Sequence, residues 1–328
     1  MNKNEKVLGR VCEVQRDLYS VLCEFGEIQA HLKGTFYKKD LEFPTIGDYV
    51  MLQYNPYGSS RIETVCERTS EFRRADQSGH AAGYVKTMKE QVLAANFDYA
   101  FIVVSLNQNY NLNRIARYVT VVLQSGARPV VVLTKSDLCE NPNPYVEEVK
   151  KISDKVEAYA ISAITGTGID QLNEYMKEGT TIALVGSSGV GKSTLVNTLA
   201  GEEVMKVSEI RQEDARGRHT TTHRQLIKLP SGVTFLDIPG IRELGMVEVE
   251  DGLNDTFSDI TKYFGTCKFG NCTHRTEPGC AIKAAIENHE ITEDRWNLYC
   301  SLQQENTWAT TKIKRKNVLK RTHRLVNQ

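Results

Sequence analysis

The clearest chemical signal in this chain is a glycine-rich segment that ends in lysine and serine. Residues 186–193 read GSSGVGKS, which fits the phosphate-binding pattern GxxxxGK[ST]. An apolar run at 181–185 leads into the segment and a helix-forming run at 193–200 follows it, as the pattern requires. Such a loop turns its N–H groups toward phosphate oxygens, with the Lys192 ammonium on the β- and γ-phosphates and the Ser193 hydroxyl on Mg²⁺. The predicted phosphate-binding residues are Gly186, Ser187, Ser188, Gly189, Val190, Gly191, Lys192, Ser193 and Thr194.

A second motif, which could select the base of that nucleotide, lies upstream of the phosphate loop. Residues 134–137 read TKSD and follow the apolar run 129–133. An Asp137 carboxylate can accept hydrogen bonds from the N1–H and the exocyclic amine of guanine, a donor pair that adenine lacks. The Lys135 stem can pack over the ring, and the segment after the run 156–161 could contact the base edge through a backbone N–H. The predicted base-binding residues are Thr134, Lys135, Ser136, Asp137, Ser162, Ala163 and Ile164.

Two segments downstream of the phosphate loop match the switch regions of a guanine-nucleotide enzyme. Asp237 and Gly240 occupy the DxxG positions, where the carboxylate holds Mg²⁺ through water and the glycine N–H contacts the γ-phosphate. The segment 216–223, RGRHTTTH, lies between the loop and Asp237, where a threonine must reach Mg²⁺. Three adjacent threonines, 220–222, leave its identity open, and we favour Thr221. The predicted Mg²⁺ ligands are Ser193, Thr221 and Asp237, and the predicted catalytic groups are Lys192, Thr221 and His219.

The residue after the DxxG segment bears on how fast the nucleotide is hydrolysed. Ras-like enzymes place a water-orienting glutamine there, whereas this chain has Ile241, which cannot orient water. Intrinsic hydrolysis is therefore expected to be slow, with another group or a partner supplying the missing function. His219 is the nearest candidate, because it is a titratable side chain in the first switch.

The order of these motifs is rotated, since the base motif of an ordinary GTPase follows its phosphate loop. The region 97–250 alternates apolar runs with helical patterns, which predicts a doubly wound α/β domain. Because domain ends often lie close together, a rotated chain can keep the same core, with the old ends rejoined near 177–179. The second switch then runs directly into the C-terminal region, so we expect the nucleotide state to reposition that region. The predicted strands cover 99–104, 129–133, 156–161, 181–185, 225–229 and 233–236, and Asn111 is expected to cap a helix.

The N-terminal region, residues 1–68, reads as several short strands. Tyr19, Val21 and Cys23 alternate with other residues, and so do later positions, which predicts a small closed barrel. These patterns alone leave both an OB-fold and an SH3-like barrel open. Residues 69–96, which include a loop-like QSGHAAG segment, are predicted to be a linker.

The C-terminal region, residues 251–328, combines helical patterns with a cluster of possible metal ligands. Cys267, Cys272, His274 and Cys280 follow the spacing C-x4-C-x-H-x5-C. Three thiolates and one imidazole suit a tetrahedral Zn²⁺ ion, and four protein ligands leave no open position, so we predict one structural zinc site. After Glu305 the chain carries basic residues with no acidic ones, so this tail could lie along phosphates or form a solvated terminus.

The overall composition bounds the class of protein. The chain has 328 residues, and its Lys+Arg and Asp+Glu counts are both 41, so net charge does not point to nucleic acid. No apolar run approaches the roughly 20 residues of a membrane span, and the N-terminal segment MNKNEK is polar, which does not resemble a signal peptide. We therefore expect a cytoplasmic protein with no membrane partner, acting as a monomer on GTP and GDP with Mg²⁺.

The whole chain resembles the family of circularly permuted ribosome small subunit-dependent GTPase A. The resemblance rests on the rotated order of TKSD, SAITG, GSSGVGKS, RHTTTH and DIPG, on the segment NQNYNLNR at 107–114, and on the cysteine–histidine block with its EPG segment. It implies an N-terminal OB-fold, a central GTPase domain and a zinc-binding helical domain. It also implies late maturation of the small (30S) ribosomal subunit, binding to its rRNA, and GTPase activity stimulated by the subunit. Ile238 departs from the threonine usual in the family, at a position that contributes mainly backbone.

Three other functions are compatible with parts of this sequence. A permuted GTPase acting on the large subunit is disfavoured by the barrel and the zinc cluster, and sedimentation with isolated subunits would decide. A nucleotide-gated RNA-binding scaffold would release from its target normally without hydrolysis. A P-loop ATPase is disfavoured because Asp137 would then have no partner on the base.

Overall fold

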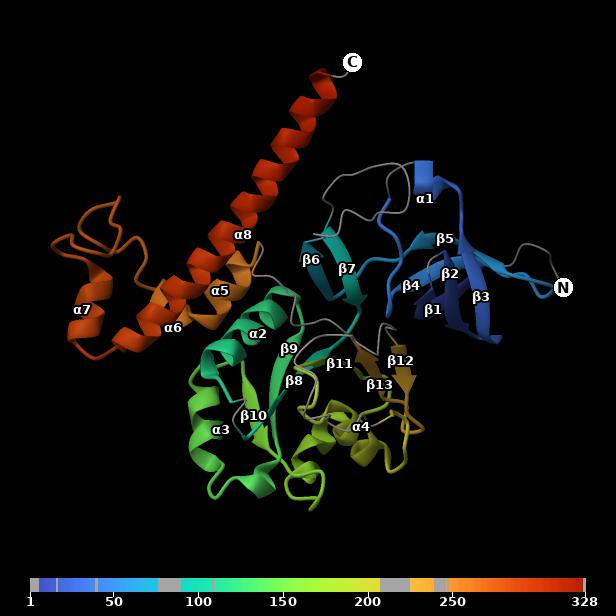
Figure 1. Cartoon of the computed structure of the whole chain (residues 1–328), viewed down its shortest axis with the longest axis horizontal. Helices are drawn as coiled ribbons and strands as arrows, with labels where there is room; N and C mark the ends of the chain where they lie inside the picture. Colours follow the sequence, from blue (N-terminus) through green and yellow to red (C-terminus); the bar gives the residue numbers. More distant parts are fainter. Residues whose placement is uncertain are drawn as a thin grey trace, which may run out of the picture.

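The computed structural model of this chain places an N-terminal barrel, a central α/β sheet and a C-terminal group of helices side by side (Figure 1). The structure describes residues 6–15, 17–38, 41–75, 90–107, 110–206, 225–238, 246 and 248–326. Within these residues, no helix combines the length and the apolar character needed to cross a membrane.

Five strands form the closed N-terminal barrel, in the order β1-β2-β3-β5-β4 with β4 pairing back to β1. They are β1 (Lys6–Gln15), β2 (Leu18–Cys23), β3 (Gly26–Leu32), β4 (Tyr49–Gln53) and β5 (Ser60–Val65), with the short helix α1 (Thr35–Lys38) after β3. Alternate residues such as Val11, Val21 and Leu52 point inward and are fully buried. The strands β3 and β5 run parallel and the other pairs antiparallel. This five-stranded order is that of an OB-like barrel, so the predicted barrel is confirmed and the SH3-like alternative is removed.

The segment 69–96, predicted to be a linker, contains two paired strands within its described residues. They are β6 (Glu71–Ala75) and β7 (Glu90–Ala95), which pair antiparallel. The Ala95 N–H donates to the Ile46 carbonyl at 3.0 Å, and the Glu71 N–H donates to the Ser125 carbonyl at 3.0 Å. These two strands therefore contact the barrel on one side and the central domain on the other.

An arginine of the barrel strengthens that connection. Arg10 on β1 donates to the Asn96 carbonyl at 2.8 Å, and its guanidinium lies 5.1 Å from the centre of the Tyr49 ring. Burial lowers the pKa of this guanidinium, which nevertheless keeps its charge because arginine ionises so strongly. The barrel sheet also continues into the central sheet, because Glu13 on β1 pairs with Gln225.

The central sheet has the strand order β10-β9-β8-β11-β13-β12. Its strands are β8 (Tyr99–Ser105), β9 (Arg128–Thr134), β10 (Glu157–Ala160), β11 (Thr181–Val185), β12 (Gln225–Lys228) and β13 (Thr234–Asp237). All neighbours run parallel except β12, which pairs antiparallel with β13. The predicted strands are thus confirmed, and their continuous apolar runs reflect burial on both faces of the sheet.

Helices cover both faces of this sheet. The first face carries α2 (Leu112–Gln124) and α3 (Asn143–Lys150), and the second carries α4 (Lys192–Ala200) with the 3-10 helix η2 (Ile169–Tyr175). Along β8, Ile102 and Val104 belong to the first core, whereas Phe101 and Val103 belong to the second. As predicted, Asn111 caps α2, with its side-chain oxygen accepting from the Arg114 N–H at 2.8 Å.

The C-terminal helices share the first core rather than forming a separate one. They are α5 (Glu250–Thr256), α6 (Ser258–Thr261), α7 (Ala281–Glu287) and α8 (Glu293–Val326). At Gly252, α5 approaches α2 so closely that an added Cβ would lie 2.2 Å from the Thr120 carbonyl oxygen. The Gly252 N–H donates to the Gln124 side chain at 2.8 Å, and the Thr120 and Thr256 hydroxyls are 3.0 Å apart. The predicted boundary between 250 and 251 therefore falls on a continuous packing interface, which we call the α2–α5 seam.

The long helix α8 contacts both ends of this seam. Arg295, near its start, donates to the Ile152 and Thr256 carbonyls, each at 2.8 Å, and pairs with Asp259. Asn306, further along, accepts from the Val249 N–H at 3.3 Å. The helix then extends away from the body of the protein to the C-terminus, as Figure 1 shows.

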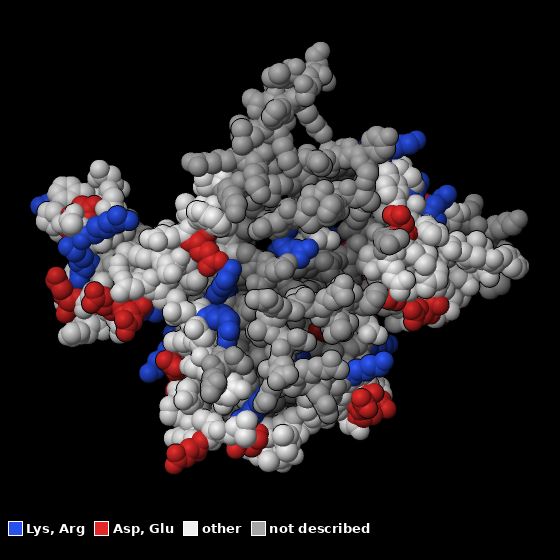
Figure 2. Space-filling view, viewed as in Figure 1, with Lys and Arg blue, Asp and Glu red and all other residues white. Residues whose placement is uncertain are grey.

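Charged side chains of both signs are interleaved on the described part of the face in Figure 2, over the C-terminal helices, the sheet domain and the barrel. This mixing agrees with the equal counts of basic and acidic residues in the chain.

Candidate nucleotide and metal sites

The phosphate loop connects β11 to α4, as the sequence predicts. Gly186 opens the loop with a φ of +151°, and a Cβ there would lie 2.4 Å from the Val103 carbonyl oxygen of the neighbouring strand. Only glycine fits such a close approach to backbone. Helix α4 begins at Lys192, so its first N–H groups and the positive end of its dipole face the space enclosed by the loop.

The Lys192 ammonium lies inside this loop. It donates to the Gly186 carbonyl at 2.9 Å and to the Ser187 carbonyl at 3.0 Å. Asp237 ends the adjacent strand β13, in register with Leu184 on β11. Burial raises the pKa of the Asp237 carboxyl, and the Lys192 ammonium pulls that pKa back down. The structure thus places the predicted phosphate-binding lysine and the predicted Mg²⁺ carboxylate within electrostatic reach of each other.

The base motif is bonded directly to the phosphate loop. The Thr134 hydroxyl, at the end of β9, donates to the Val190 carbonyl at 2.6 Å. The Lys135 ammonium donates to the Gly189 carbonyl at 3.2 Å. Asp137 follows on the exposed 3-10 helix η1 (Ser136–Leu138). Motifs more than fifty residues apart in the chain, and in rotated order, are therefore held side by side.

The third predicted base segment lies beside the second. The Ser136 N–H donates to the Ile161 carbonyl at 3.1 Å, which joins η1 to the end of β10. The buried Ser162 hydroxyl accepts from the Thr165 N–H at 3.2 Å and holds the turn that contains Ala163 and Ile164. Ile164 is 83% exposed, so this turn lies at the surface.

Several predicted residues of the switch regions lie outside the described residues. They are His219, the three threonines 220–222 with Thr221 among them, Gly240 and Ile241. The described part of the predicted nucleotide site therefore comprises the phosphate loop, the base segments and Asp237.

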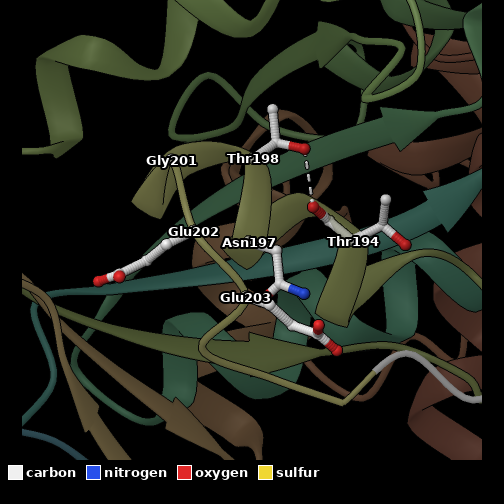
Figure 3. A pocket seen from close by; sticks show the side chains of 6 residues that line it. All are labelled: Thr194, Asn197, Thr198, Gly201, Glu202 and Glu203. Carbon is white, nitrogen blue, oxygen red and sulfur yellow. Dashed lines mark hydrogen bonds between the residues drawn. The ribbon is translucent and has the colours of Figure 1, made fainter.

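A separate pocket lies along α4, and Figure 3 shows its lining side chains. It measures about 470 Å³ and is lined by Thr194, Asn197, Thr198, Gly201, Glu202 and Glu203. Only Thr194 belongs to the predicted nucleotide site, and two glutamates would repel phosphates. Apart from Thr194, this open depression therefore lies outside the predicted nucleotide site.

The four predicted metal ligands come together between α6 and α7. The Cys267, Cys272 and Cys280 sulfurs and one His274 nitrogen lie within 4.8 Å of one another. His274 Nδ1 is 3.5 Å from the Cys267 sulfur and 3.4 Å from the Cys280 sulfur. Zn–S and Zn–N bonds at tetrahedral angles give an S···N separation of about 3.6 Å. The cluster can therefore hold a metal ion, and its donor set and spacing fit zinc.

Neighbouring groups fix these ligands in place. The Phe264 ring stacks on His274 at 5.3 Å, and the Trp296 ring meets it edge-on at 5.9 Å. The Ala281 N–H donates to the Cys267 sulfur at 3.3 Å and lowers the pKa of that thiol, which favours the thiolate that a metal requires. These supporting aromatic residues were not predicted, because nothing in their spacing links them to the ligand motif.

Glu277 organises the turn between two of the ligands. Its carboxylate accepts from the Thr273 N–H at 2.8 Å, and from the Arg275 and Thr276 N–H groups, each at 3.0 Å. The Thr273 hydroxyl also donates to it at 2.5 Å. These bonds hold the pKa of the Glu277 carboxyl well below its usual range. The sequence pattern included Glu277 in the EPG segment but did not predict this role.

A phosphate loop after the central strand β11, a base motif at the end of β9 and a DxxG aspartate at the end of β13 define a P-loop GTPase domain whose chain order is circularly permuted. A family model of the RsgA GTPase matches residues 65–247, more than half of the chain. This chain belongs to the RsgA GTPase family.

Individual relatives extend the match over nearly the whole chain. The Listeria monocytogenes protein named small ribosomal subunit biogenesis GTPase RsgA 2 is 40% identical over 306 residues, which cover 93% of this chain and 85% of the relative. The crystal structure of YjeQ from Thermotoga maritima superposes with a TM-score of 0.67 at 27% identity, covering 91% of this chain and 97% of that one. YloQ, described as a circularly permuted GTPase, shares the fold, with a TM-score of 0.62 at 24% identity over 96% of this chain and 97% of YloQ.

Proposed function

We propose that this chain binds GTP and hydrolyses it on the small (30S) ribosomal subunit, in a late step of that subunit's maturation. One observation supports the binding of a guanine nucleotide: the base motif is bonded to the phosphate loop. Thr134 donates to the Val190 carbonyl and Lys135 donates to the Gly189 carbonyl. The ribosomal part is supported by family membership and by the names of relatives such as the Listeria monocytogenes protein.

The arrangement of the phosphate loop and the base motif supports the following residue roles. The exposed Asp137 carboxylate accepts from the guanine N1–H and exocyclic amine, and backbone N–H groups near Ala163 and Ile164 complete the base site. The loop N–H groups and the Lys192 ammonium bind the phosphates, since the lysine can exchange its loop carbonyls for phosphate oxygens. Thr194, in the first turn of α4, adds a hydroxyl at the same end of the helix.

Mg²⁺ would be held by the Ser193 hydroxyl, Asp237 through water, and Thr221. When bound, it neutralises charge that develops on the phosphates. Zn²⁺ would be held by the cysteine and histidine cluster as a closed structural site. Both assignments rest on donor sets that fit the respective ion.

Slow intrinsic turnover follows from Ile241, which offers no group to orient water. Family membership supports the proposal that the subunit stimulates this turnover. We assign the water-positioning role to His219 in the first switch, or to a group supplied by the subunit. A His219→Ala variant should keep its nucleotide affinity and lose most of its stimulated turnover. Unchanged stimulated turnover would remove His219 from the mechanism.

The barrel and α8 are the elements we expect to contact rRNA. OB-like barrels bind nucleic acid through one face and its loops. Tyr57 stands 91% exposed on the turn between β4 and β5, and that turn is held by the Asn55 side chain, which accepts from the Tyr57 N–H at 3.1 Å. An exposed aromatic ring on such a turn is suited to stacking on an unpaired base. We further propose that the protein acts as a monomer in the cytoplasm, where ribosomal subunits mature.

The decisive experiment measures GTP turnover by the full-length protein, alone and with purified small subunits. Large subunits and ATP serve as matched controls. We expect turnover to rise strongly with small subunits and GTP only. Equal stimulation by large subunits would refute the proposed partner, and equal turnover of ATP would refute the proposed base site.

A further inference from the structure

Asn96 lies at the junction between the barrel and the sheet domain, after the end of β7 and before the start of β8. It is only 7% exposed, and its backbone adopts the left-handed conformation, with a φ of +56°. Asparagine adopts this conformation more readily than most residues other than glycine. The chain therefore changes direction at a buried polar residue, and the partners of its polar atoms decide what this junction holds together.

Each polar atom of Asn96 has a partner, and the partners come from segments far apart in the chain. On the barrel side, its carbonyl accepts from the Arg10 guanidinium at 2.8 Å, and its side-chain nitrogen donates to the Gly47 carbonyl at 3.2 Å. Its side-chain oxygen accepts from the Thr69 N–H at 3.0 Å, and its own N–H donates to the Ser70 carbonyl at 2.8 Å. One residue thus joins β1, the segment that precedes β4 and the segment that precedes β6.

The residues that follow Asn96 are bonded to the sheet domain. The Asp98 carboxylate accepts from the Thr181 N–H at 2.8 Å, and the Asp98 N–H donates to the Thr181 carbonyl at 2.9 Å, at the start of β11. Phe97 donates its N–H to the Ser70 hydroxyl at 2.8 Å. Because Phe97 alone separates the barrel contacts of Asn96 from the sheet contacts of Asp98, the connection has little slack.

The barrel also approaches this junction through its backbone. At Gly47, whose φ is +85°, an added Cβ would lie 2.1 Å from the Ala95 carbonyl oxygen. The Ala95 N–H donates to the Ile46 carbonyl at 3.0 Å. The Arg10 Nε donates at 3.4 Å to the same Gly47 carbonyl that accepts from Asn96. Bonds from β1 and from the junction therefore meet on one carbonyl of the barrel.

We propose that Asn96 is a positioning residue, which holds the barrel in one orientation relative to the GTPase domain, and that this orientation prepares the barrel for binding to the small subunit. The second half of this inference rests on the proposed function. A surface that is already ordered binds more tightly than one that must be ordered on binding. A loosened barrel should therefore weaken the response to the subunit, whereas nucleotide binding, which uses other residues, should not change.

Asn96→Gly tests the structural half, because glycine accepts the left-handed backbone and only the side-chain bonds are lost. Hydrogen exchange of the full-length protein is followed by mass spectrometry. The Thr69 amide loses its acceptor and the Ala95 amide reports the bond to the barrel, so both should exchange about tenfold faster than in the wild type. The β9 amides should exchange at the wild-type rate, which establishes that the sheet domain is folded. An unchanged rate at Ala95 would overturn the positioning role.

Two further variants sharpen this test. Arg10→Met keeps the stem of the side chain and removes the donors to Asn96 and Gly47, so it should speed exchange at Ala95 from the barrel side. Asn288→Gly, at the exposed end of α7, is the matched control for the gain of a glycine and should leave exchange at Ala95 unchanged. Equally fast exchange in this control would overturn the assignment of the role to Asn96.

The functional half is tested by GTP turnover at increasing concentrations of purified small subunits. For Asn96→Gly, turnover without subunits and the dissociation constant of GDP should match the wild type. The subunit concentration at half-maximal stimulation should rise about two- to tenfold, with the same maximal rate, because the barrel must be ordered again on binding. A half-maximal concentration equal to that of the wild type, despite faster exchange at Ala95, would overturn this half. If small subunits do not stimulate the wild-type protein, the proposed function fails together with this half, whereas hydrogen exchange still decides the structural half.

Discussion

Replacing Gly252 by alanine would test the α2–α5 seam that joins the GTPase domain to the C-terminal helices. The new Cβ would meet the Thr120 carbonyl oxygen at 2.2 Å, with the Gln124 Cβ at 2.9 Å and the Gln124 nitrogen at 3.0 Å. Two of these three atoms are backbone atoms of α2, which cannot rotate away as the end of a side chain can. Helix α5 would have to move outward, and the 2.8 Å bond from the Gly252 N–H to Gln124 would lengthen.

The size of the effect follows from three contributions. Overpacking a tight interface costs about 1–3 kcal/mol, and losing the hydrogen bond costs about 0.5–1.5 kcal/mol. Alanine inside α5 regains about 1 kcal/mol of helix propensity over glycine. We therefore expect a net loss of about 0.5–3.5 kcal/mol in the free energy of unfolding.

Urea unfolding followed by circular dichroism measures this loss as a lower midpoint. The matched control is Gly34→Ala, an exposed glycine whose added Cβ meets nothing within 4 Å, and its midpoint should stay near that of the wild type. A Gly252→Ala protein as stable as the control, or more stable, would show that α5 does not pack on α2 at this distance.

Three further predictions concern the base site, the barrel and the metal cluster. Asp137→Asn replaces the carboxylate by an amide, so GDP affinity should fall at least about tenfold and xanthosine diphosphate should become the better ligand in a competition assay; an unchanged preference for GDP would contradict the assigned role. Arg68→Met removes the guanidinium that donates to both oxygens of the fully buried Asp48, each at 2.8 Å, and should destabilise the protein by about 3–5 kcal/mol in urea unfolding. Glu277→Gln weakens the turn that holds the metal ligands, so zinc loss to a chelating indicator should be about tenfold faster. Release at the wild-type rate would show that this turn does not support the metal.

Much of the sheet domain could be predicted because its physics is local. A strand buried on both faces is a continuous apolar run, so 99–104 and 181–185 are visible without any tertiary information. The phosphate loop and the Asn111 cap are also local, since each depends on residues within a few positions of one another. The four possible metal ligands could be found for the same reason, because they lie within one short segment.

The remaining features depend on contacts between distant residues. The bond from Thr134 to Val190 spans 56 positions, and no pattern in either segment indicates it. Alternating residues in short strands cannot distinguish an OB-like order from another barrel, because that choice lies in which strands pair. The segment that contains β6 and β7 was predicted to be a linker, because the sequence QSGHAAG between the two short strands is typical of a loop. The close approach of α5 to α2 at Gly252 could not be predicted, because it depends on which helix packs against α5.

The connection between the barrel and the sheet domain has a mechanical consequence. Because β1 pairs with β12 and Arg10 bonds to the Asn96 carbonyl, the barrel cannot swing freely to find its own contact. The barrel and the sheet domain therefore present two binding surfaces at a fixed distance from each other. The second contact forms at high effective concentration only on a partner whose matching elements stand equally far apart. A partner in which one of the two contacted elements is displaced would bind through one surface only. It would therefore dissociate faster than a partner with both elements in place.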